Sequence, residues 1–130
     1  MRHGKIGRKL GRKTANRKAL MMNLASSLIQ HKKIKTTDTK AKELRRYIEP
    51  LVSFAKKGDV HSRRQVLKKI PQKKVVRELF DIIGPKYSDR NGGYTRIIKL
   101  GFRDNDCAPV SIIEFVDFIN NVDKVTESKN

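Results

Sequence analysis

The sequence feature that most restricts the possible fold of this chain is its first 18 residues, MRHGKIGRKLGRKTANRK. They contain eight Lys or Arg residues, no Asp or Glu, and four apolar residues. A stretch of this composition cannot bury itself, and Gly4, Gly7 and Gly11 are unfavourable inside a helix. We therefore expect residues 1–13 to form an extended basic arm outside a compact domain.

Positive charge is in excess over the whole chain as well as in its first residues. The chain has 31 Lys and Arg against 13 Asp and Glu, a net charge of +18, which requires a polyanion or an anionic surface nearby. Residues 1–37 hold eleven of the bases and no acid, whereas residues 104–130 hold six acids and two bases. We expect the N-terminal part to face the polyanion, and residues 122–130 to form a loose tail.

Several classes of protein are disfavoured. Cys107 is the single cysteine, which excludes an intramolecular disulfide and a cysteine-based zinc site. No apolar run reaches the length of a membrane span, and the start lacks the apolar segment of a secretory signal. A transit peptide is disfavoured because glycines interrupt the basic stretch and no serine precedes Ser26. We expect a cytoplasmic protein.

The sequence carries no recognisable catalytic site. His3, His31 and His61 have no metal-ligand spacing with one another or with Cys107. The NGG segment lacks the Lys-Ser/Thr ending of a phosphate-binding loop. We expect no enzyme, no metal and no cofactor.

Apolar spacing predicts a first helix that begins near residue 14, with Thr14 or Asn16 as its N-cap. Its main apolar stripe is formed by Leu20, Leu24 and Leu28. This stripe is widened by Met21, Ala25 and Ile29. The segment KIKTT, residues 33–37, is predicted to be a short strand.

A second helix is predicted to start at Thr37 or Asp38 and to stop at Gly58. Pro50 removes one backbone hydrogen bond, so we expect this helix to be bent. Asp59 is predicted to cap a third helix that ends near residue 70.

Pro71 is predicted to occupy the first position of a fourth helix, and Gly84 and Pro85 to end it. The buried stripe of this helix is expected to comprise Val75, Val76, Leu79, Phe80 and Ile83.

Two strands are expected to close the domain. Residues 94–100 and 110–118 are rich in β-branched and aromatic side chains, and residues 101–109 have the composition of a hairpin connection. The predicted class is α+β, a small sheet of about three strands with helices packed on one face. The order is α-β-α-α-α-β-β, within a domain at residues 14–121.

Nucleic acid is the predicted polyanion, and the arm is its predicted main contact. Arginine forks onto phosphate, lysine acts as a point charge, and glycine lets the backbone approach closely. Eight phosphate contacts predict a log–log salt slope of roughly −6 to −7. The predicted contacts of the arm and the first helix are Arg2, His3, Lys5, Arg8, Lys9, Arg12, Lys13, Arg17 and Lys18.

The domain adds further candidate contacts. These are Lys32, Lys33, Lys35, Arg45, Arg46, Arg63, Arg64, Arg90, Tyr94 and Arg96. For the helical clusters a solvated face and an RNA contact both stay open, since Glu43 and Glu49 are close enough to pair within the second helix. Tyr94 either stacks on a base or packs on the core. Arg96 is expected to share a strand face with Tyr94 and Ile98, with Lys99 on the other face.

Folded RNA fits these features better than duplex DNA. No predicted helix looks like a base-reading recognition helix, whereas a glycine-punctuated basic arm suits irregular RNA recognised by shape and phosphate. A DNA-binding nucleoid-type protein remains the alternative. A membrane-surface protein would need an apolar face on the arm, which offers only Ile6 and Leu10.

Four blocks of the sequence resemble the L17 family of bacterial large-subunit ribosomal proteins, in the order that the family has them. They are MRHGKIGRKLGRKTANRK, SLIQHKKIKTT, AKELRRYIEPLVSFAK and GGYTRIIKLGFRDNDCAPVSIIEFVD, and the resemblance spans residues 1 to about 118. Asn16 stands where the family often has His.

The resemblance implies a structural component of the large ribosomal subunit that binds large-subunit ribosomal RNA. It also implies a compact α+β domain, a tolerated kink at Pro50, and a place near the peptide exit region beside other ribosomal proteins, including the small protein L32.

Overall fold

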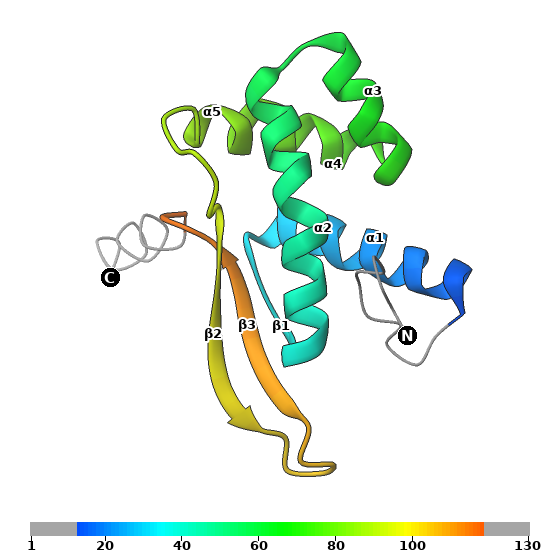
Figure 1. Cartoon of the computed structure of the whole chain (residues 1–130), viewed down its shortest axis with the longest axis vertical. Coiled ribbons are helices and arrows are strands. Elements are labelled where there is room, and N and C mark those ends of the chain that lie inside the picture. The colour runs from blue at the N-terminus through cyan, green and yellow to red at the C-terminus, as the bar shows by residue number, and fades with distance from the viewer. Residues whose placement is uncertain (1–12, 119–130) are drawn as a thin grey trace, which may run out of the picture.

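The computed structural model describes residues 13–118 and has the predicted α+β architecture (Figure 1). The helical elements are α1 (Thr14–His31), α2 (Asp38–Lys57), α3 (Val60–Lys69), α4 (Lys73–Glu78), the π-helical turn η1 (Leu79–Ile83) and α5 (Gly84–Lys86). The strands are β1 (Lys33–Thr37), β2 (Thr95–Phe102) and β3 (Pro109–Phe115). The predicted order of elements is confirmed. The predicted tail and all of the predicted arm except Lys13 lie outside the described residues.

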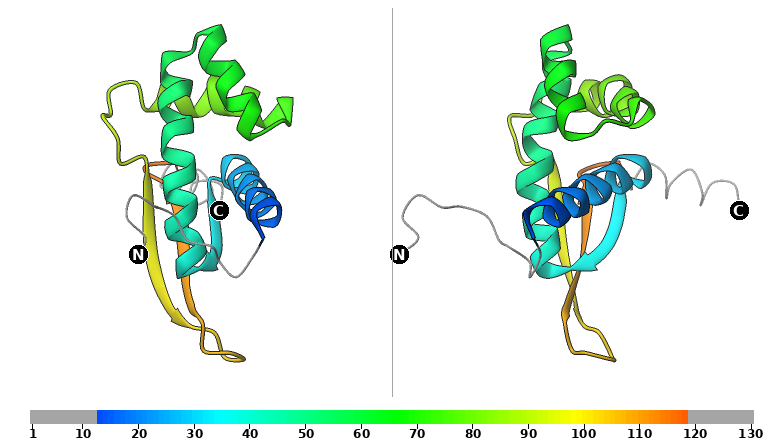
Figure 2. Two further views of the ribbon diagram at one scale, coloured as in Figure 1. Left: turned by 45° about the vertical axis from the view of Figure 1, so that its right-hand side comes forward. Right: turned by 90° about the vertical axis from the view of Figure 1, so that its right-hand side faces the viewer.

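The three strands form one antiparallel sheet in the order β1-β3-β2. Helix α2 lies along the sheet, and α3, α4 and α5 pack around its C-terminal half, beyond the end of the strands (Figures 1 and 2). Ile113 of the central strand pairs with Ile34 on one side and Ile97 on the other, so an apolar row crosses the sheet. Arg96 and Ile98 share the opposite face, as predicted, since their β3 neighbours are Glu114 and Ile112.

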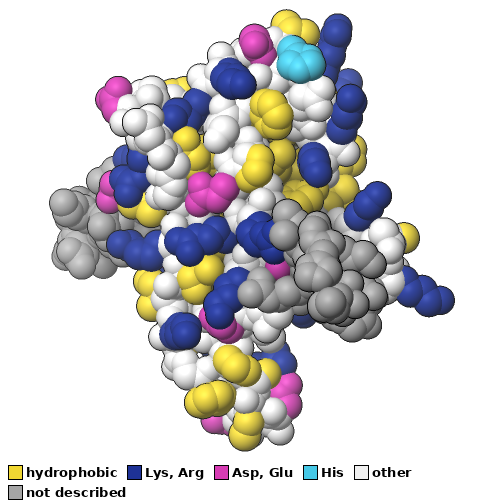
Figure 3. Space-filling model, in the orientation of Figure 1, with side chains coloured by type: hydrophobic (Ala, Val, Ile, Leu, Met, Phe, Trp, Pro, Cys, Tyr) yellow, Lys and Arg dark blue, Asp and Glu magenta, His cyan; other side chains and the backbone are white. Residues whose placement is uncertain are grey.

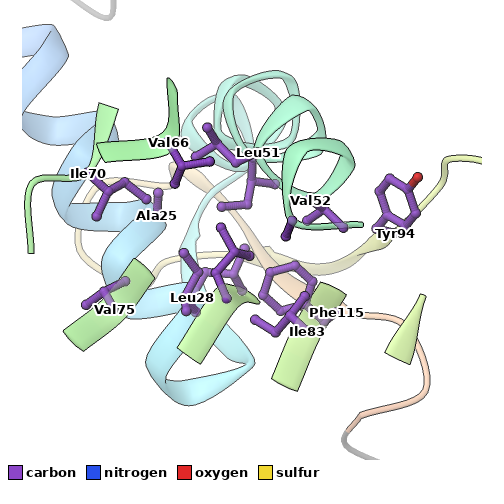
Figure 4. Packing of buried hydrophobic residues seen from close by; sticks show 14 of the residues in the cluster. Ala25, Leu28, Leu51, Val52, Val66, Ile70, Val75, Ile83, Tyr94 and Phe115 are labelled. Atoms are coloured by element: carbon purple, nitrogen blue, oxygen red, sulfur yellow. The ribbon is translucent and has the colours of Figure 1, made fainter. Parts of the chain in front are cut away.

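The core lies between α2, the other helices and the sheet (Figure 4). On α1 the buried face is centred on Ala25, Leu28 and Ile29, while Leu20 and Leu24 are only half-buried. The buried face of α1 thus combines the small Ala25 and Ser26 with the larger Leu28 and Ile29. Ser26, also buried, donates a hydrogen bond to Gln72 Oε1 at 2.9 Å.

Helix α2 continues through Pro50, whose side chain is exposed, so the missing backbone donor lies on the solvent side. The helix ends at Gly58, which adopts the left-handed conformation with φ 70°, as predicted. The buried side chains of α2 are Ala41, Leu44, Ile48, Leu51, Val52 and Ala55.

The helix starts are capped differently from one another. Lys13 is the N-cap of α1 and makes no side-chain cap bond, so the predicted capping by Thr14 or Asn16 is wrong. Thr14 Oγ1 instead accepts a hydrogen bond from Arg17 Nη2 at 3.0 Å. Asp59 caps α3 as predicted, because its Oδ1 accepts the Ser62 backbone N–H at 2.7 Å.

We expect the contribution of the Asp59 charge to the α3 cap to be lost in acid. Hydrogen bonds from Ser62 hold the pKa of Asp59 below its ordinary 3.8. A lowered folded pKa contributes stability above the ordinary value, and this contribution disappears as pH falls through the folded pKa. Asp59→Asn keeps an equally good cap without the charge. The Tm of this variant should therefore lie below that of the parent at about pH 6, and the difference should shrink as pH falls below 3.8. A Tm difference that stays constant over this range would contradict the assignment.

Two expectations about the fourth helix are wrong. Pro71 precedes the N-cap Gln72 instead of opening α4. Gly84 and Pro85 do not end the helical path, because the Gly84 N–H bonds to the Leu79 carbonyl across the wider π-helical turn. Pro85 then lies in the first turn of α5, where its missing N–H is not needed. The predicted buried stripe of Val75, Val76, Leu79, Phe80 and Ile83 is confirmed.

Gly84 is required by close packing and not by its backbone angles. A Cβ placed there would lie 2.7 Å from the Ala55 carbonyl oxygen and 2.9 Å from its carbon. The absence of a side chain thus lets α5 approach the backbone of α2, which explains a glycine within a helical path.

Candidate nucleic-acid interface

The first turns of α1 carry the part of the predicted arm cluster that the structure describes, namely Lys13, Arg17 and Lys18. Lys13 and Lys18 are exposed, and Arg17 is half-buried beside Thr14. The remaining arm candidates lie outside the described residues and stay predictions. They are Arg2, His3, Lys5, Arg8, Lys9 and Arg12.

A groove of about 360 Å³ opens beside Lys18, where α1, α2 and α3 meet. We call it the Tyr47 groove, and its lining residues are Lys18, Ala19, Met22, Tyr47, Lys68 and Lys69. Tyr47 donates its hydroxyl proton to the Lys69 carbonyl at 2.9 Å, and Lys69 Nζ lies 5.6 Å from the ring centroid. Burial raises the pKa of this hydroxyl, so it stays neutral. Among the lining residues Lys18 was a predicted contact, and for the α3 cluster that includes Lys68 and Lys69 a solvated face and an RNA contact both stayed open.

Lys32 is directed into the protein. It follows α1 with φ 67°, and its Nζ donates to the Ile29 carbonyl at 2.6 Å and to Glu78 Oε1 at 2.5 Å. The side chain thereby closes the C-terminus of α1 and joins it to α4. An RNA contact by Lys32 would require this ion pair to open. Lys33 and Lys35 on β1 are exposed.

The arginines of α2 are both held by the protein. Arg45 Nη2 donates to the Thr95 carbonyl at 3.1 Å. Arg46 pairs with Glu43 at 3.4 Å, as the intrahelical spacing predicted. Both side chains remain exposed at the surface.

Glu49 is close enough in sequence to pair with these arginines, but its hydrogen bonds go to the start of β2. Its carboxylate accepts the Thr95 hydroxyl at 2.8 Å, the Thr95 N–H at 3.2 Å and the Tyr94 N–H at 3.3 Å. Glu49 therefore anchors the start of β2 on α2, and because the two residues are 46 positions apart, sequence analysis missed this role.

Tyr94 packs in the core, which is one of the two roles that the sequence left open, and its ring is therefore not available to stack on a base. It is 3% exposed, and its ring centroid lies 5.3 Å from that of Tyr87. Its hydroxyl accepts Lys56 Nζ at 3.0 Å and donates to the Arg90 carbonyl at 3.3 Å. The glycines that precede it let the chain turn inward before β2 begins.

Arg90 and Arg96 flank this buried tyrosine and stay half-exposed. Arg90 Nε donates to the Gly93 carbonyl at 3.1 Å. Arg96 donates through Nε and Nη2 to one oxygen of the buried Glu114, at 3.0 and 2.6 Å. Both guanidinium groups are thus held in place with donors left over for a phosphate.

On α3, Arg63 and Arg64 are exposed. The Arg63 guanidinium lies 4.8 Å from the Phe80 ring centroid, which orients it without neutralising it.

Lys and Arg side chains are spread over the face of the molecule that Figure 3 shows. Six ion pairs join described residues, and the exposed bases outside these pairs include Lys18, Lys33, Lys35, Arg64, Lys68 and Lys69. These side chains come from α1, β1 and α3 and have no fixed acidic partner between residues 13 and 118. The geometry therefore suits many weak phosphate contacts and not a single catalytic centre.

Within residues 13–118, no group of three or more His, Cys, Asp or Glu side chains is placed to hold a metal ion. None of the described helices combines the length and the apolar character that crossing a membrane requires.

Comparison with known proteins identifies the family. The profile described as Ribosomal protein L17 matches residues 20–116. The large ribosomal subunit protein bL17 of Syntrophotalea carbinolica is 51% identical over 131 residues, covering 99% of this chain and 84% of the relative. The bL17 of Syntrophus aciditrophicus is 49% identical over 99% of this chain and 100% of the relative. The bL17 of Roseobacter denitrificans is 54% identical over 90% and 84%. With the family profile and full-length relatives in agreement, this chain belongs to the ribosomal protein L17 family.

Proposed function

We propose that this protein is a structural, non-enzymatic component of the large ribosomal subunit that binds large-subunit ribosomal RNA. The observation that carries the proposal is the family match, since curated relatives that align with nearly the whole chain are large ribosomal subunit proteins. The net charge of +18 supports a polyanionic partner.

The proposed binding has two parts. Residues 1–13 act as an arm that becomes ordered when phosphates neutralise its bases. The domain, residues 14–121, folds around its own core and offers exposed bases such as Lys33, Lys35 and Arg64. Association thus draws on counterion release and on the shape of folded RNA.

Neighbouring ribosomal proteins are the second class of proposed partner, and the small protein L32 is one candidate. Phe102 and Leu100 on β2 are 73% and 49% exposed. Large exposed apolar side chains suit a protein surface better than a phosphate backbone. We place the protein in the bacterial cytoplasm, within the ribosome, and leave residues 122–130 as a tail without an assigned partner.

Co-sedimentation with large subunits tests the proposed function. The protein should pellet with subunits in low salt and be released by high salt. Its affinity for transcribed large-subunit ribosomal RNA should fall with a log–log slope of roughly −6 to −7 if eight phosphates are contacted. Equal or tighter binding to duplex DNA of the same length would contradict the proposal and favour the nucleoid-type alternative.

A further inference from the structure

We propose that the Tyr47 groove binds one unpaired nucleotide of RNA, with the base against the Tyr47 ring and the adjoining phosphates beside the lysines. This inference rests on the proposed function and deepens it, because it assigns one place on the domain to a nucleotide and not only to a phosphate. The occupant is inferred from the chemistry of the groove, in which an aromatic ring, apolar walls and uncompensated positive charge are combined.

The aromatic ring is held in position before any ligand arrives. The hydrogen bond from the Tyr47 hydroxyl to the Lys69 carbonyl fixes the ring of α2 against α3. The ring also packs against the core cluster, so it loses little conformational freedom when a base stacks on it. Ala19 and Met22 of α1 form the apolar wall beside it. A base stacked on such a ring is bound without much preference for its identity, since every base has a π-face.

The charge around the ring has one sign. Lys18 comes from α1, whereas Lys68 and Lys69 come from α3, and no acidic side chain lines the groove. Three ammonium groups around an aromatic ring match a nucleotide with its flanking phosphates better than an uncharged ligand. The volume of about 360 Å³ lies within the range of pockets that accept small molecules.

The groove also adjoins the part of the chain that is proposed to anchor the protein. Lys18 stands about one turn from the start of α1, where Lys13 links the helix to the arm. An RNA strand that contacts Lys13 and the first turn of α1 therefore lies close to the groove. Because the Tyr47 hydroxyl already donates its hydrogen bond to the protein, it does not donate one to the edge of a stacked base. We therefore expect the groove to accept any of the four bases.

Binding of the full chain to transcribed large-subunit ribosomal RNA, measured by filter retention, tests this inference. Lys18→Ala, Lys68→Ala and Lys69→Ala combined should weaken binding about tenfold more than the matched exposed set Lys73→Ala, Lys74→Ala and Lys86→Ala. Tyr47→Leu should weaken it about tenfold, whereas Tyr47→Phe, which keeps the ring, should bind nearly as the parent does. Circular dichroism confirms that each variant is folded.

Ultraviolet cross-linking of the same complex locates the contact. The peptide that contains Tyr47 should carry a cross-linked nucleotide. If the parent binds RNA but this peptide is not cross-linked and the two lysine sets weaken binding equally, the groove proposal is wrong while the proposed function stands. Failure of the parent to bind RNA refutes the proposed function itself. In purified large subunits, a cross-link from the Tyr47 peptide to another ribosomal protein would mean that a protein segment occupies the groove. That result would overturn the proposal.

Discussion

Replacing Arg8, Arg12 and Arg17 together by glutamate is expected to abolish incorporation into the large subunit while the domain stays folded. The three substitutions lower the net charge from +18 to +12 and put repulsion where phosphate contacts are proposed. The described member of the three, Arg17, donates to Thr14 at the surface and is not part of the core cluster. The salt slope for ribosomal RNA should become shallower by about two to three units. Sucrose-gradient sedimentation of cell extracts and the thermal unfolding of purified protein measure the two expected outcomes.

The control has the same change of charge at another place. Lys73, Lys74 and Arg77 are exposed on α4, and their combined replacement by glutamate also lowers the net charge to +12. This variant should still enter the subunit, with only a moderate loss of affinity. If both triple variants are excluded equally, overall charge and not the arm determines assembly. Normal incorporation of the arm variant would show that the arm is not the anchor.

Phe115→Ala is expected to lower the free energy of unfolding by about 3–5 kcal/mol, the range found when a buried phenylalanine is truncated. Phe115 is fully buried at the end of the central strand β3. Its ring centroid lies 6.1 Å from that of Phe118 and 6.3 Å from that of Tyr87. Truncation leaves a cavity among aromatic rings that are held by the sheet and by α5, so collapse around it is limited. A loss of this size is a large share of the stability of a small domain.

Phe102→Ala supplies a matched comparison, because the same type of side chain is removed from β2, the neighbouring strand of the same hairpin. Phe102 is 73% exposed, so its truncation should change the free energy of unfolding by no more than about 0.5 kcal/mol. Urea denaturation followed by circular dichroism measures both values. Similar losses for the two variants would mean that the aromatic cluster around Phe115 does not hold the sheet to the helices. Phe102→Ala should also leave RNA binding unchanged.

The elements that sequence analysis predicted correctly depend on neighbours in the chain. The strand at residues 33–37, the cap by Asp59 and the stop at Gly58 each follow from side chains within a few positions of one another. The errors arise where a local preference and the packing of distant residues disagree. Proline and glycine usually mark helix boundaries, which explains the wrong predictions at Pro71, Gly84 and Pro85. At Gly84 the glycine is required because the chain there lies against the Ala55 backbone. On α1, Ala25 lies in the core whereas the larger Leu20 and Leu24 are only half-buried.

The sequence by itself determined the order of elements, the α+β class and the excess of positive charge at the start of the chain. These follow from periodicity and composition, which need no knowledge of distant contacts. Only the tertiary structure decided what individual side chains do. Tyr94 was buried by Tyr87, Glu49 was committed to Thr95, and Lys32 was paired with Glu78. The Glu49–Thr95 hydrogen bond and the Lys32–Glu78 ion pair each join residues 46 positions apart. Their partners are set by packing geometry that no local sequence pattern encodes.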